Sequence, residues 1–223
     1  MELYDVMCTT FAAREFTSDP LPDAALFKIL DKARFAPSGG NRQGWRVIVV
    51  RDRGTREALA ELSAPAAKRY AAQLQAGENP WNTIDPISVD PGTIERTPAP
   101  ARLTEPFVRA PVVLVVCVDL KVVAATDQSL ARVGVIAGAS VYPFAWNILL
   151  AARHEGFAGT ITTLAVAEEP KLQELLGIPR HVAVGAIMPL GRPVKQLTTL
   201  KRKAVPEFTA LERWDGRRLT PGG

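Results

Sequence analysis

The sequence predicts a fold of the α/β or α+β class, in which helices and strands alternate along the chain. Three observations support this prediction. Apolar residues recur at helical spacing in several segments, the uninterrupted apolar run at 112–118 is typical of a buried strand, and proline and glycine separate the segments. A chain of 223 residues, 47% of them hydrophobic, is also long enough to bury a sizeable core.

The first third of the chain is expected to contain helices, a loop and a strand. Residues 3–11 form a short amphipathic helix, and the polar segment 17–20 separates it from the next one. Residues 22–35 form the second helix, because Pro22 and Asp23 are good start signals. The loop at 36–46 leads into a strand at 47–50, and residues 55–62 form a further helix.

The loop at 36–46 has the sequence Ala36-Pro37-Ser38-Gly39-Gly40-Asn41-Arg42-Gln43-Gly44-Trp45-Arg46, which has two interpretations. Its small residues let the backbone approach a flat polar ligand, and the side-chain amides of Asn41 and Gln43 can bind the edge of that ligand. A plain turn between a helix and a strand accounts for the same residues equally well.

Residues 64–110 lack a clear periodicity, and seven prolines fall between Pro80 and Pro111. We therefore expect an irregular insert in this part of the chain. Its aromatic residues Trp81 and Phe107 favour a cover over a pocket or an arm around a partner, and disorder is the alternative.

The second half is expected to contain a central strand at 112–118, a long helix at 129–154, a strand at 161–166, a helix at 170–176 and a strand at 182–188. The uncharged stretch from Val133 to Ala152 is long enough to cross a bilayer. Its glycines, Pro143 and Asn147 instead favour a buried helix in a soluble protein, and such burial often needs a partner subunit. The tail at 195–223 is basic around residues 201–203 and ends with aromatic residues, a composition typical of a tail that docks.

Charge and composition exclude several classes of protein. The net charge is only +4 and the basic residues are scattered, which argues against a nucleic-acid-binding surface. Cys8 and Cys117 form no CxxC pair, and neither His154 nor His181 lies in a metal-ligand pattern, so we expect no disulfide framework and no metal site. The N-terminus lacks the apolar core of a signal peptide, which predicts a cytoplasmic protein.

The chain also lacks several common catalytic motifs: it has no P-loop, no G-x-S-x-G elbow and no G-x-G-x-x-G after a strand. Glycine loops and scattered cations suit an enzyme whose chemistry belongs to a bound cofactor. Arg14, Lys201, Arg202 and Lys203 are candidate ligands for a cofactor phosphate, and solvated surface charge is the alternative for each of them.

Four segments, in order, resemble the FMN-dependent nitroreductase family. Residues 14–22, with Arg14-Glu15-Phe16-Thr17 and Pro20-Leu21-Pro22, resemble its R-x-F…P-V/L-P segment, and residues 36–45 resemble its A-P-S-x-x-N-x-Q-P-W signature. Residues 147–152 with 156–160 resemble its N-x-x-L-A-A…G-L-G segment, and residues 184–193 resemble its last strand and G-x-P ending. Each motif alone is weak, but four in sequence are fairly specific.

The resemblance implies an α+β fold with a central mixed or antiparallel sheet flanked by helices, in a single domain over residues 1–223. It also implies a homodimer with two FMN sites at the interface. The insert at 64–110 would then serve as a lid or as a dimer arm, and the tail at 195–223 would reach across the partner subunit.

The resemblance also implies roles for individual residues around the flavin ring. Arg14 would approach the pyrimidine edge, where a cation stabilises the negative charge of the reduced ring. Ser38 and Gly39 would line the ring or the ribityl chain, and Asn41 and Gln43 would supply hydrogen bonds nearby.

Three further positions complete the implied site. Gly159 and Thr160 would present backbone N–H groups near flavin N5, and Arg202, helped by Lys201, would bind the phosphate. The chemistry would belong to the flavin, so no side chain acts as a nucleophile.

Two positions depart from the family pattern. The family commonly has R-R-S where this chain has Thr10-Phe11-Ala12, and the first Arg and the Ser of that motif bind the phosphate. Thr10 can supply one hydroxyl, so FMN affinity would rely on the tail cations, or the site would be weak or altered. Gly44 replaces the usual proline, which removes a fixed φ angle but keeps the loop length.

The sequence thus predicts an FMN-dependent oxidoreductase that passes hydride from NAD(P)H through the flavin to a small acceptor, such as a nitroaromatic or a quinone, in a ping-pong cycle. Two alternatives remain at this stage. One is a specialised flavoprotein of the same fold, such as a dehydrogenase on a biosynthetic intermediate, a flavin-destroying synthase or a dehalogenase. The other is a flavin-binding protein that catalyses nothing.

Overall fold

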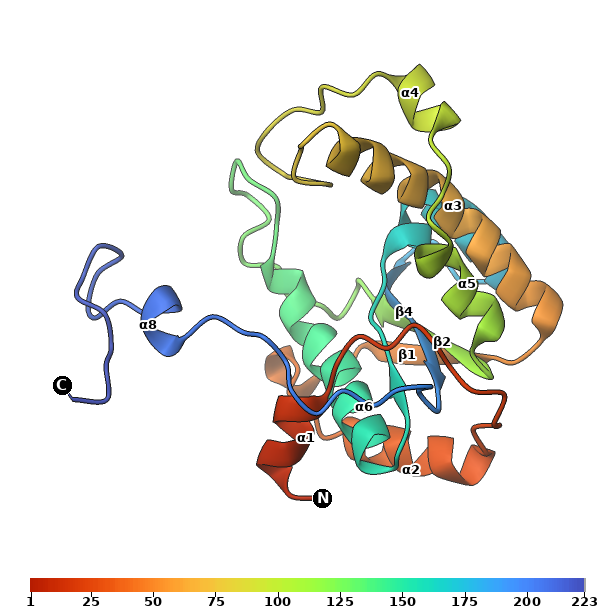
Figure 1. The fold of residues 1–223 in the computed structure, drawn as a ribbon, viewed down its shortest axis with the longest axis horizontal. Coiled ribbons are helices and arrows are strands. Elements are labelled where there is room, and N and C mark those ends of the chain that lie inside the picture. Colours follow the sequence, from red (N-terminus) through yellow and green to blue (C-terminus); the bar gives the residue numbers. More distant parts are fainter. Residues whose placement is uncertain (223) are drawn as a thin grey trace.

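A four-stranded antiparallel sheet forms the centre of the molecule in this computed structural model, which describes residues 1–222 (Figure 1). The spatial order of the strands is β1-β2-β4-β3. Their bounds are Trp45–Val50 for β1, Val112–Asp119 for β2, Ala158–Gly159 for β3 and Val182–Gly191 for β4. The α+β class predicted from the sequence is confirmed.

Strand β2 is the buried centre of this sheet. It pairs with β1 on one side and with β4 on the other, and its residues from Val112 to Cys117 are at most 1% exposed. A run of valine and leucine suits this position, because side chains on both faces of the strand must be covered. The prediction of a central strand at 112–118 is therefore confirmed.

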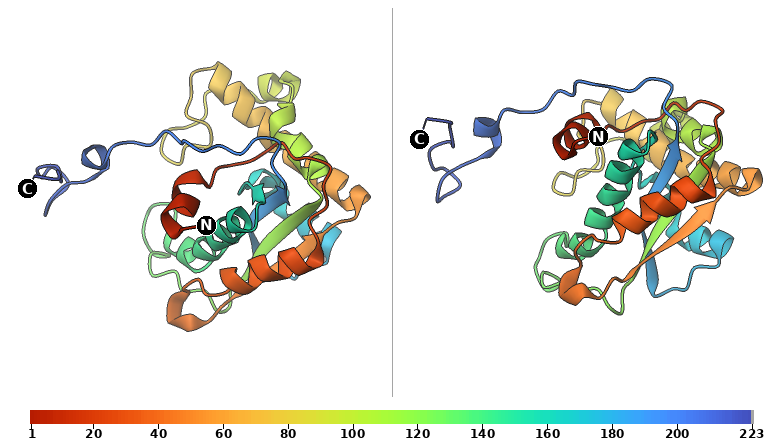
Figure 2. Two further views of the ribbon diagram at one scale, coloured as in Figure 1. Left: turned by 60° about the horizontal axis from the view of Figure 1, so that its bottom comes forward. Right: turned by 90° about the horizontal axis from the view of Figure 1, so that it is seen from below.

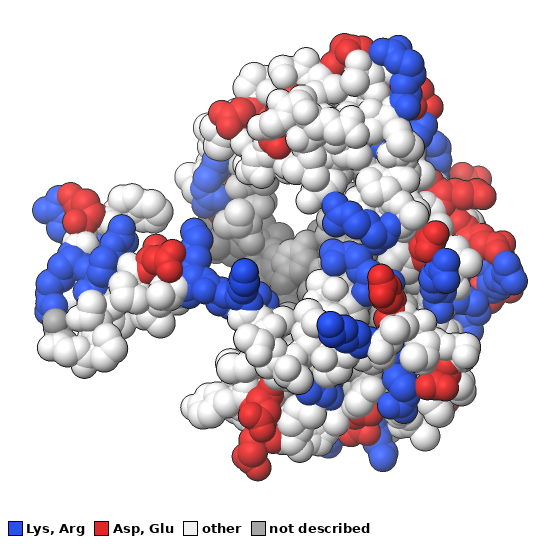
Figure 3. Space-filling view, viewed as in Figure 1, with Lys and Arg blue, Asp and Glu red and all other residues white. Residues whose placement is uncertain are grey.

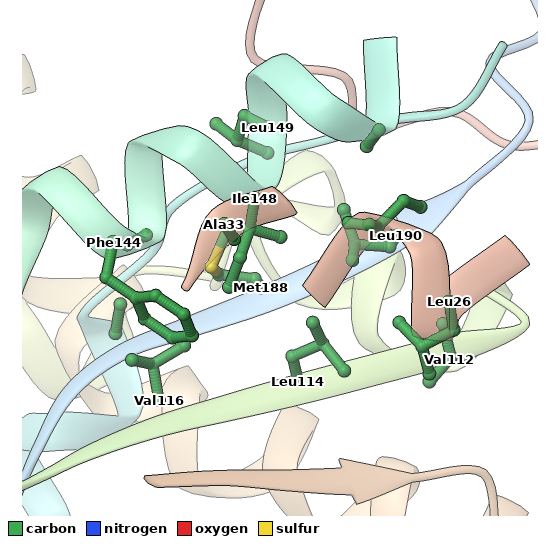
Figure 4. Packing of buried hydrophobic residues seen from close by; sticks show 14 of the residues in the cluster. Leu26, Ala33, Val112, Leu114, Val116, Phe144, Ile148, Leu149, Met188 and Leu190 are labelled. Atoms are coloured by element: carbon green, nitrogen blue, oxygen red, sulfur yellow. The ribbon is translucent and has the colours of Figure 1, made fainter. Parts of the chain in front are cut away.

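Helices cover both faces of the sheet. One face packs against α2, Asp23–Ala33, and α6, Tyr142–His154, and Figure 4 shows apolar side chains of both helices meeting those of β2 and β4. The other face packs against α3, Arg53–Gln75, α5, Ala101–Arg109, and α7, Glu169–Leu176. The first helix, α1, Leu3–Thr9, lies against α6 (Figure 2).

The prediction that residues 64–110 are irregular was wrong over most of that range. Helix α3 continues through Pro65 to Gln75, and α4, Pro91–Arg96, and α5 follow it. Alanine has the highest helix propensity, and the buried face of α3 consists largely of alanines such as Ala66 and Ala67, so a search for large apolar residues at helical spacing overlooks it. Only residues 76–90 and 97–100 connect these helices without regular structure.

Two further predictions need correction. The long helix expected at 129–154 is helical only as the short 3-10 helix η2, Ile136–Ser140, and as α6, because Pro143 lies in the first turn of a new helix, a position that proline favours. The strand expected at 161–166 is absent from the described residues: β3 comes earlier, Thr162 makes an isolated bridge to Ile187, and η3, Leu164–Glu168, follows.

The remaining segments extend the domain on two sides. The 3-10 helix η1, Gly39–Asn41, lies in the loop between α2 and β1, and α8, Val205–Phe208, lies in the C-terminal tail. Figure 1 shows this tail leaving the sheet and projecting away from the rest of the chain. Within residues 1–222, none of the helices combines the length and the apolar composition needed to cross a membrane.

Candidate active site

The N-terminal segment joins the edge of the sheet at β3. Ala12 forms a parallel bridge with Gly159, and the backbone N–H of Ala13 donates to the carbonyl of Gly159 at 2.9 Å. Gly159 must be a glycine here, because a Cβ at this position would overlap Leu190 and the carbonyl of Pro189. The side chain of Arg14 is thereby brought to the same pocket as Thr160.

That pocket has a volume of about 560 Å³ and lies between the edge of the sheet and the helices α3 and α5. Arg14, Thr160 and residues 161–164 line it, together with Arg102 of α5. Most of its other lining side chains are apolar or aromatic: Ala66, Tyr70, Pro80, Trp81, Leu103, Pro106 and Phe107. A pocket that combines an apolar wall with a few polar groups is typical of a small-molecule site.

Arg14 is a cation without an acidic partner. Its one side-chain hydrogen bond goes to the carbonyl of Ala12 at 3.4 Å, and no described carboxylate forms an ion pair with it. Partial desolvation lowers the pKa of Arg14, the charge of Arg102 lowers it further, and Tyr70 opposes this shift. An anionic group in the pocket would therefore compensate a charge that the protein leaves uncompensated.

A hydrogen-bonded latch holds Trp81 at the rim of the pocket. The indole ring lies 3.9 Å from the guanidinium of Arg69, and the backbone N–H of Trp81 donates to the side chain of Gln73 at 3.2 Å. Gln73 in turn donates to Glu78 at 2.8 Å, and the other oxygen of Glu78 accepts from the backbone N–H of Ser88 at 2.8 Å. The hydroxyl of Ser88 also donates to Glu78, and this hydrogen bond, together with those from Gln73 and from the backbone of Ser88, lowers the pKa of Glu78 to about 2. We refer to these five residues as the Trp81 latch.

The loop with Ser38, Gly39, Asn41 and Gln43 lies elsewhere on the chain, and none of these residues lines the Arg14 pocket. The backbone N–H of Gly39 donates to Ser140 Oγ at 3.2 Å, which ties the loop to η2. The backbone N–H of Gln43 donates to Ser38 Oγ at 2.9 Å, and Asn41 and Gln43 both have positive φ angles, 53° and 49°. Because such angles are strained for side-chain-bearing residues, the surrounding structure holds this loop in a specific shape.

Gly44 also has a structural reason to differ from proline. A Cβ at Gly44 would overlap the side chain of Val122, and the carbonyl of Gly44 accepts a hydrogen bond from Asp119 at 2.8 Å. Trp45 follows and stacks on Phe144, with ring centroids 4.8 Å apart. The loop is therefore packed closely against residues 119–122 and α6.

The residues assigned to a phosphate do not come together in one chain. The hydroxyl of Thr10 is buried and donates to the carbonyl of Val6 at 2.7 Å, so it already serves the end of α1. Lys201 and Arg202 lie on the projecting tail, where the Arg202 guanidinium donates to the carbonyl of Lys201 at 2.7 Å. Figure 3 shows basic side chains both on this tail and beside the hollow in the middle of the same face.

Within one chain, Arg14, Gly159 and Thr160 therefore lie close together, whereas the loop 38–43 and the tail lie apart from them. Sequence reasoning missed Tyr70 and Arg102, which line the pocket, and Ser140, which accepts a hydrogen bond from Gly39. It gave Trp81 only a general role. Tyr70 and Arg102 belong to helices in the range that was expected to be irregular. A correct helix assignment would have put both residues on helices, but their place at the pocket depends on how α3 packs against α5.

The chain is similar in sequence to a known protein family and to several known proteins. A family model described as the Nitroreductase family matches residues 10–192. An "NADH dehydrogenase" of Thermus thermophilus is 29% identical over 192 residues, which cover 82% of each chain. An "Iodotyrosine deiodinase 1" of Rattus norvegicus is 24% identical over 218 residues, which cover 93% of this chain and 68% of the relative.

Solved structures share the fold at lower identity. A BluB-like flavoprotein from Clostridium difficile has a TM-score of 0.69 and 20% identity, with 96% of this chain and 100% of the other covered. An iodotyrosine deiodinase bound to FMN and 3-iodo-L-tyrosine has a TM-score of 0.66 and 19% identity, with 92% and 96% covered. The match of the family model to most of the chain shows that this protein belongs to the Nitroreductase family.

Proposed function

We propose that this protein is an FMN-dependent oxidoreductase that uses NAD(P)H to reduce a small electrophilic acceptor. The observation that carries this proposal is the pocket in which Arg14, a cation without an acidic partner, lies beside Thr160 at the edge of the sheet. Family membership and the FMN bound to a deiodinase of the same fold support the choice of cofactor.

The residues of the pocket fit the ring of a flavin. Arg14 would stabilise the negative charge that a reduced flavin carries, and apolar side chains such as Phe107 and Pro189 would exclude water from the ring. When bound, FMN would supply the hydride chemistry, and the acceptor would be a nitroaromatic, a quinone or a similar electrophile. The tail cations Lys201 and Arg202 would bind the phosphate, because the Thr10 hydroxyl is used within α1.

A second copy of the chain would complete this site. Exposed apolar side chains gather on α1, on the adjacent α6 and on the segment before it: Leu3, Tyr4, Met7, Val133, Val135, Ile136, Tyr142 and Trp146. Such a surface is typical of a subunit interface. In a homodimer the loop 38–43 of one subunit would face the Arg14 pocket of the other, and the tail would cross to the partner.

The segment 76–90 would act as a lid. Pro80 and Trp81 line the pocket, and the Trp81 latch holds the indole ring at its rim. A lid of this kind limits access of water and shapes the space for the acceptor.

Flavin content and turnover test the proposal. The purified protein should show the visible absorbance of oxidised flavin, or regain it when FMN is added, and should then oxidise NADH or NADPH with a quinone or nitroaromatic acceptor. A protein without flavin absorbance before and after FMN addition would contradict the proposal. A protein that binds FMN but turns over no acceptor in the panel would be a flavin-binding protein instead.

Reductive dehalogenation is a second candidate, because several relatives are named iodotyrosine deiodinase. Including 3-iodo-L-tyrosine in the acceptor panel tests it directly. Release of iodide that depends on the reduced flavin would select this candidate over the reduction of nitroaromatics and quinones.

A further inference from the structure

Arg102 lines the same pocket as Arg14, and the proposed flavin site assigns no role to its side chain. It belongs to the first turn of α5 and lines the pocket together with Tyr70 and Trp81. In the described part of the chain, no carboxylate forms an ion pair with Arg102. Arg109, on the same helix, is instead paired with Glu105 at 2.8 Å.

Arg102 and Arg14 are close enough to affect each other. The charge of Arg102 is the second cause, after desolvation, of the lowered pKa of Arg14. Two neighbouring cations without an acidic partner repel one another, and an anion bound near them would relieve this repulsion. The N-terminus of α5 adds positive character, since its N-cap, Pro100, makes no side-chain capping hydrogen bond.

The pocket also offers apolar surface for a flat ligand. Leu103 and Ile161 add aliphatic side chains to its lining, and Trp81 adds an aromatic ring. An aromatic ring placed here would contact apolar side chains while a charged group on it remained near Arg102.

We propose that the acceptor is an aromatic or conjugated carboxylate, and that Arg102 binds its carboxylate. The planar guanidinium can form two parallel hydrogen bonds with a carboxylate, which fixes the orientation of the ring as well as its position. This inference rests on the proposed function, because it leaves Arg14 to the flavin and assigns Arg102 to the acceptor.

A matched pair of acceptors tests the inference on the FMN-loaded protein. We expect a lower KM for 4-nitrobenzoate than for methyl 4-nitrobenzoate, which has the same ring but no charge. R102A should raise the KM for 4-nitrobenzoate by about ten-fold or more, the value of a charge-assisted hydrogen bond, and change that for the ester by less than about two-fold. R109A, the control on the same helix, should change neither value.

Measuring the binding of a carboxylate at equilibrium tests the inference without relying on turnover. Benzoate should bind to the protein, as followed by tryptophan fluorescence, and R102A should raise its Kd by a similar factor, whereas the FMN content should stay that of the wild type. Equal effects of R102A on the acid and the ester, loss of FMN, or a change confined to the KM for NAD(P)H would overturn the inference. Absence of flavin would instead contradict the proposed function. Benzoate binding would in that case still test whether Arg102 binds a carboxylate.

Discussion

Arg14 and Arg202 show how position decides the role of a single charged residue. Arg14 lies at a pocket beside the sheet, and its pKa is lowered by partial desolvation and by Arg102. Arg202 lies on an exposed tail, where its own chain offers it only a backbone carbonyl. A cation beside the flavin ring acts mainly on the reduced state, whereas a cation on the phosphate contributes equally to binding of both redox states.

We therefore expect R202A to weaken FMN binding more than R14A does. Loss of a charge-assisted hydrogen bond to the phosphate should raise the Kd for FMN by about ten-fold or more, measured by fluorescence titration of the apoprotein. R14A should instead make the reduction potential of the bound flavin more negative. R213A removes another tail cation, one paired with Asp215, and serves as the control. Equal or reversed losses would show that the assignment of the phosphate to Arg202 is wrong.

Gly159 gives a second prediction at the scale of one residue. G159A should lower the free energy of unfolding by about 1–3 kcal/mol, because the added methyl group would overlap Leu190 and the Pro189 carbonyl. G134A is the matched control, since its Cβ would meet Asp127 at an ordinary distance of 3.7 Å. Urea unfolding of both variants measures the difference, and similar midpoints would show that the edge of the sheet can move to accept a side chain.

The segment 76–90 shows how one irregular connection between helices can be ordered by a few hydrogen bonds. Gln73 is only 3% exposed although it is a polar residue of α3, and it binds both Trp81 and Glu78. A buried amide with its hydrogen bonds satisfied specifies one arrangement of the groups around it. The position of Trp81 at the pocket therefore depends on a residue within a helix rather than on the connection alone.

Acid should release the Trp81 latch. The pKa of Glu78 is lowered from 4.5 to about 2, so its stabilising effect is fully present above pH 4.5 and is lost as the pH falls toward 2. Cleavage of the segment 76–90 by pepsin should accordingly rise as the pH approaches 2, measured relative to E78Q at the same pH because pepsin itself becomes more active in acid. At pH 4.5 E78Q should be cleaved faster than the wild type, and near pH 2 the two rates should converge. A ratio of the two rates that does not change between pH 4.5 and 2 would argue against the latch.

The elements that the sequence predicted well have strong local signals. Neighbouring residues alone predict the strand β2, from its run of valines, and the start of α2, from Pro22 and Asp23. The errors arose where tertiary contacts decide the structure. Helix α3 continues through Pro65 and packs on α5 and η3. After Thr160 the chain makes only one isolated bridge to β4, between Thr162 and Ile187, before η3 begins.

The same distinction holds for the candidate site. The resemblance assigns Arg14, Gly159 and Thr160 to one larger flavin site, and hydrogen bonds between the N-terminal segment and β3 bring these three together within one chain. Tyr70 and Arg102 belong to no recognisable motif, since their proximity depends on how α3 packs against α5. Packing of this kind leaves no signature in a single sequence.

At the scale of the whole molecule, the exposed apolar surface is the feature that one chain leaves unexplained. Trp146 and Tyr142 of α6 remain 41% and 44% exposed, and Trp214 on the tail is 98% exposed. Burying large aromatic side chains stabilises an association strongly. We therefore expect a dimer in which α6 lies at the interface.

W146R should shift this dimer toward monomers and lower its FMN content, because a charge would be buried in an apolar interface. L175R places the same substitution on α7, on the other face of the sheet, and should leave both the mass and the FMN content unchanged. Light scattering at micromolar concentration measures the mass. A monomeric wild-type protein at this concentration would contradict the proposed dimer.

The separation of the loop 38–43 from the Arg14 pocket predicts that two defective variants can complement one another in a mixed dimer. If each flavin site combines the pocket of one chain with the loop of another, a hybrid of an R14A chain and an N41A chain carries both defects in one site and neither in the other. Two variants that are each defective should therefore complement one another when they are unfolded, mixed and refolded together. A mixture no more active than its parents would mean that each chain builds its site alone.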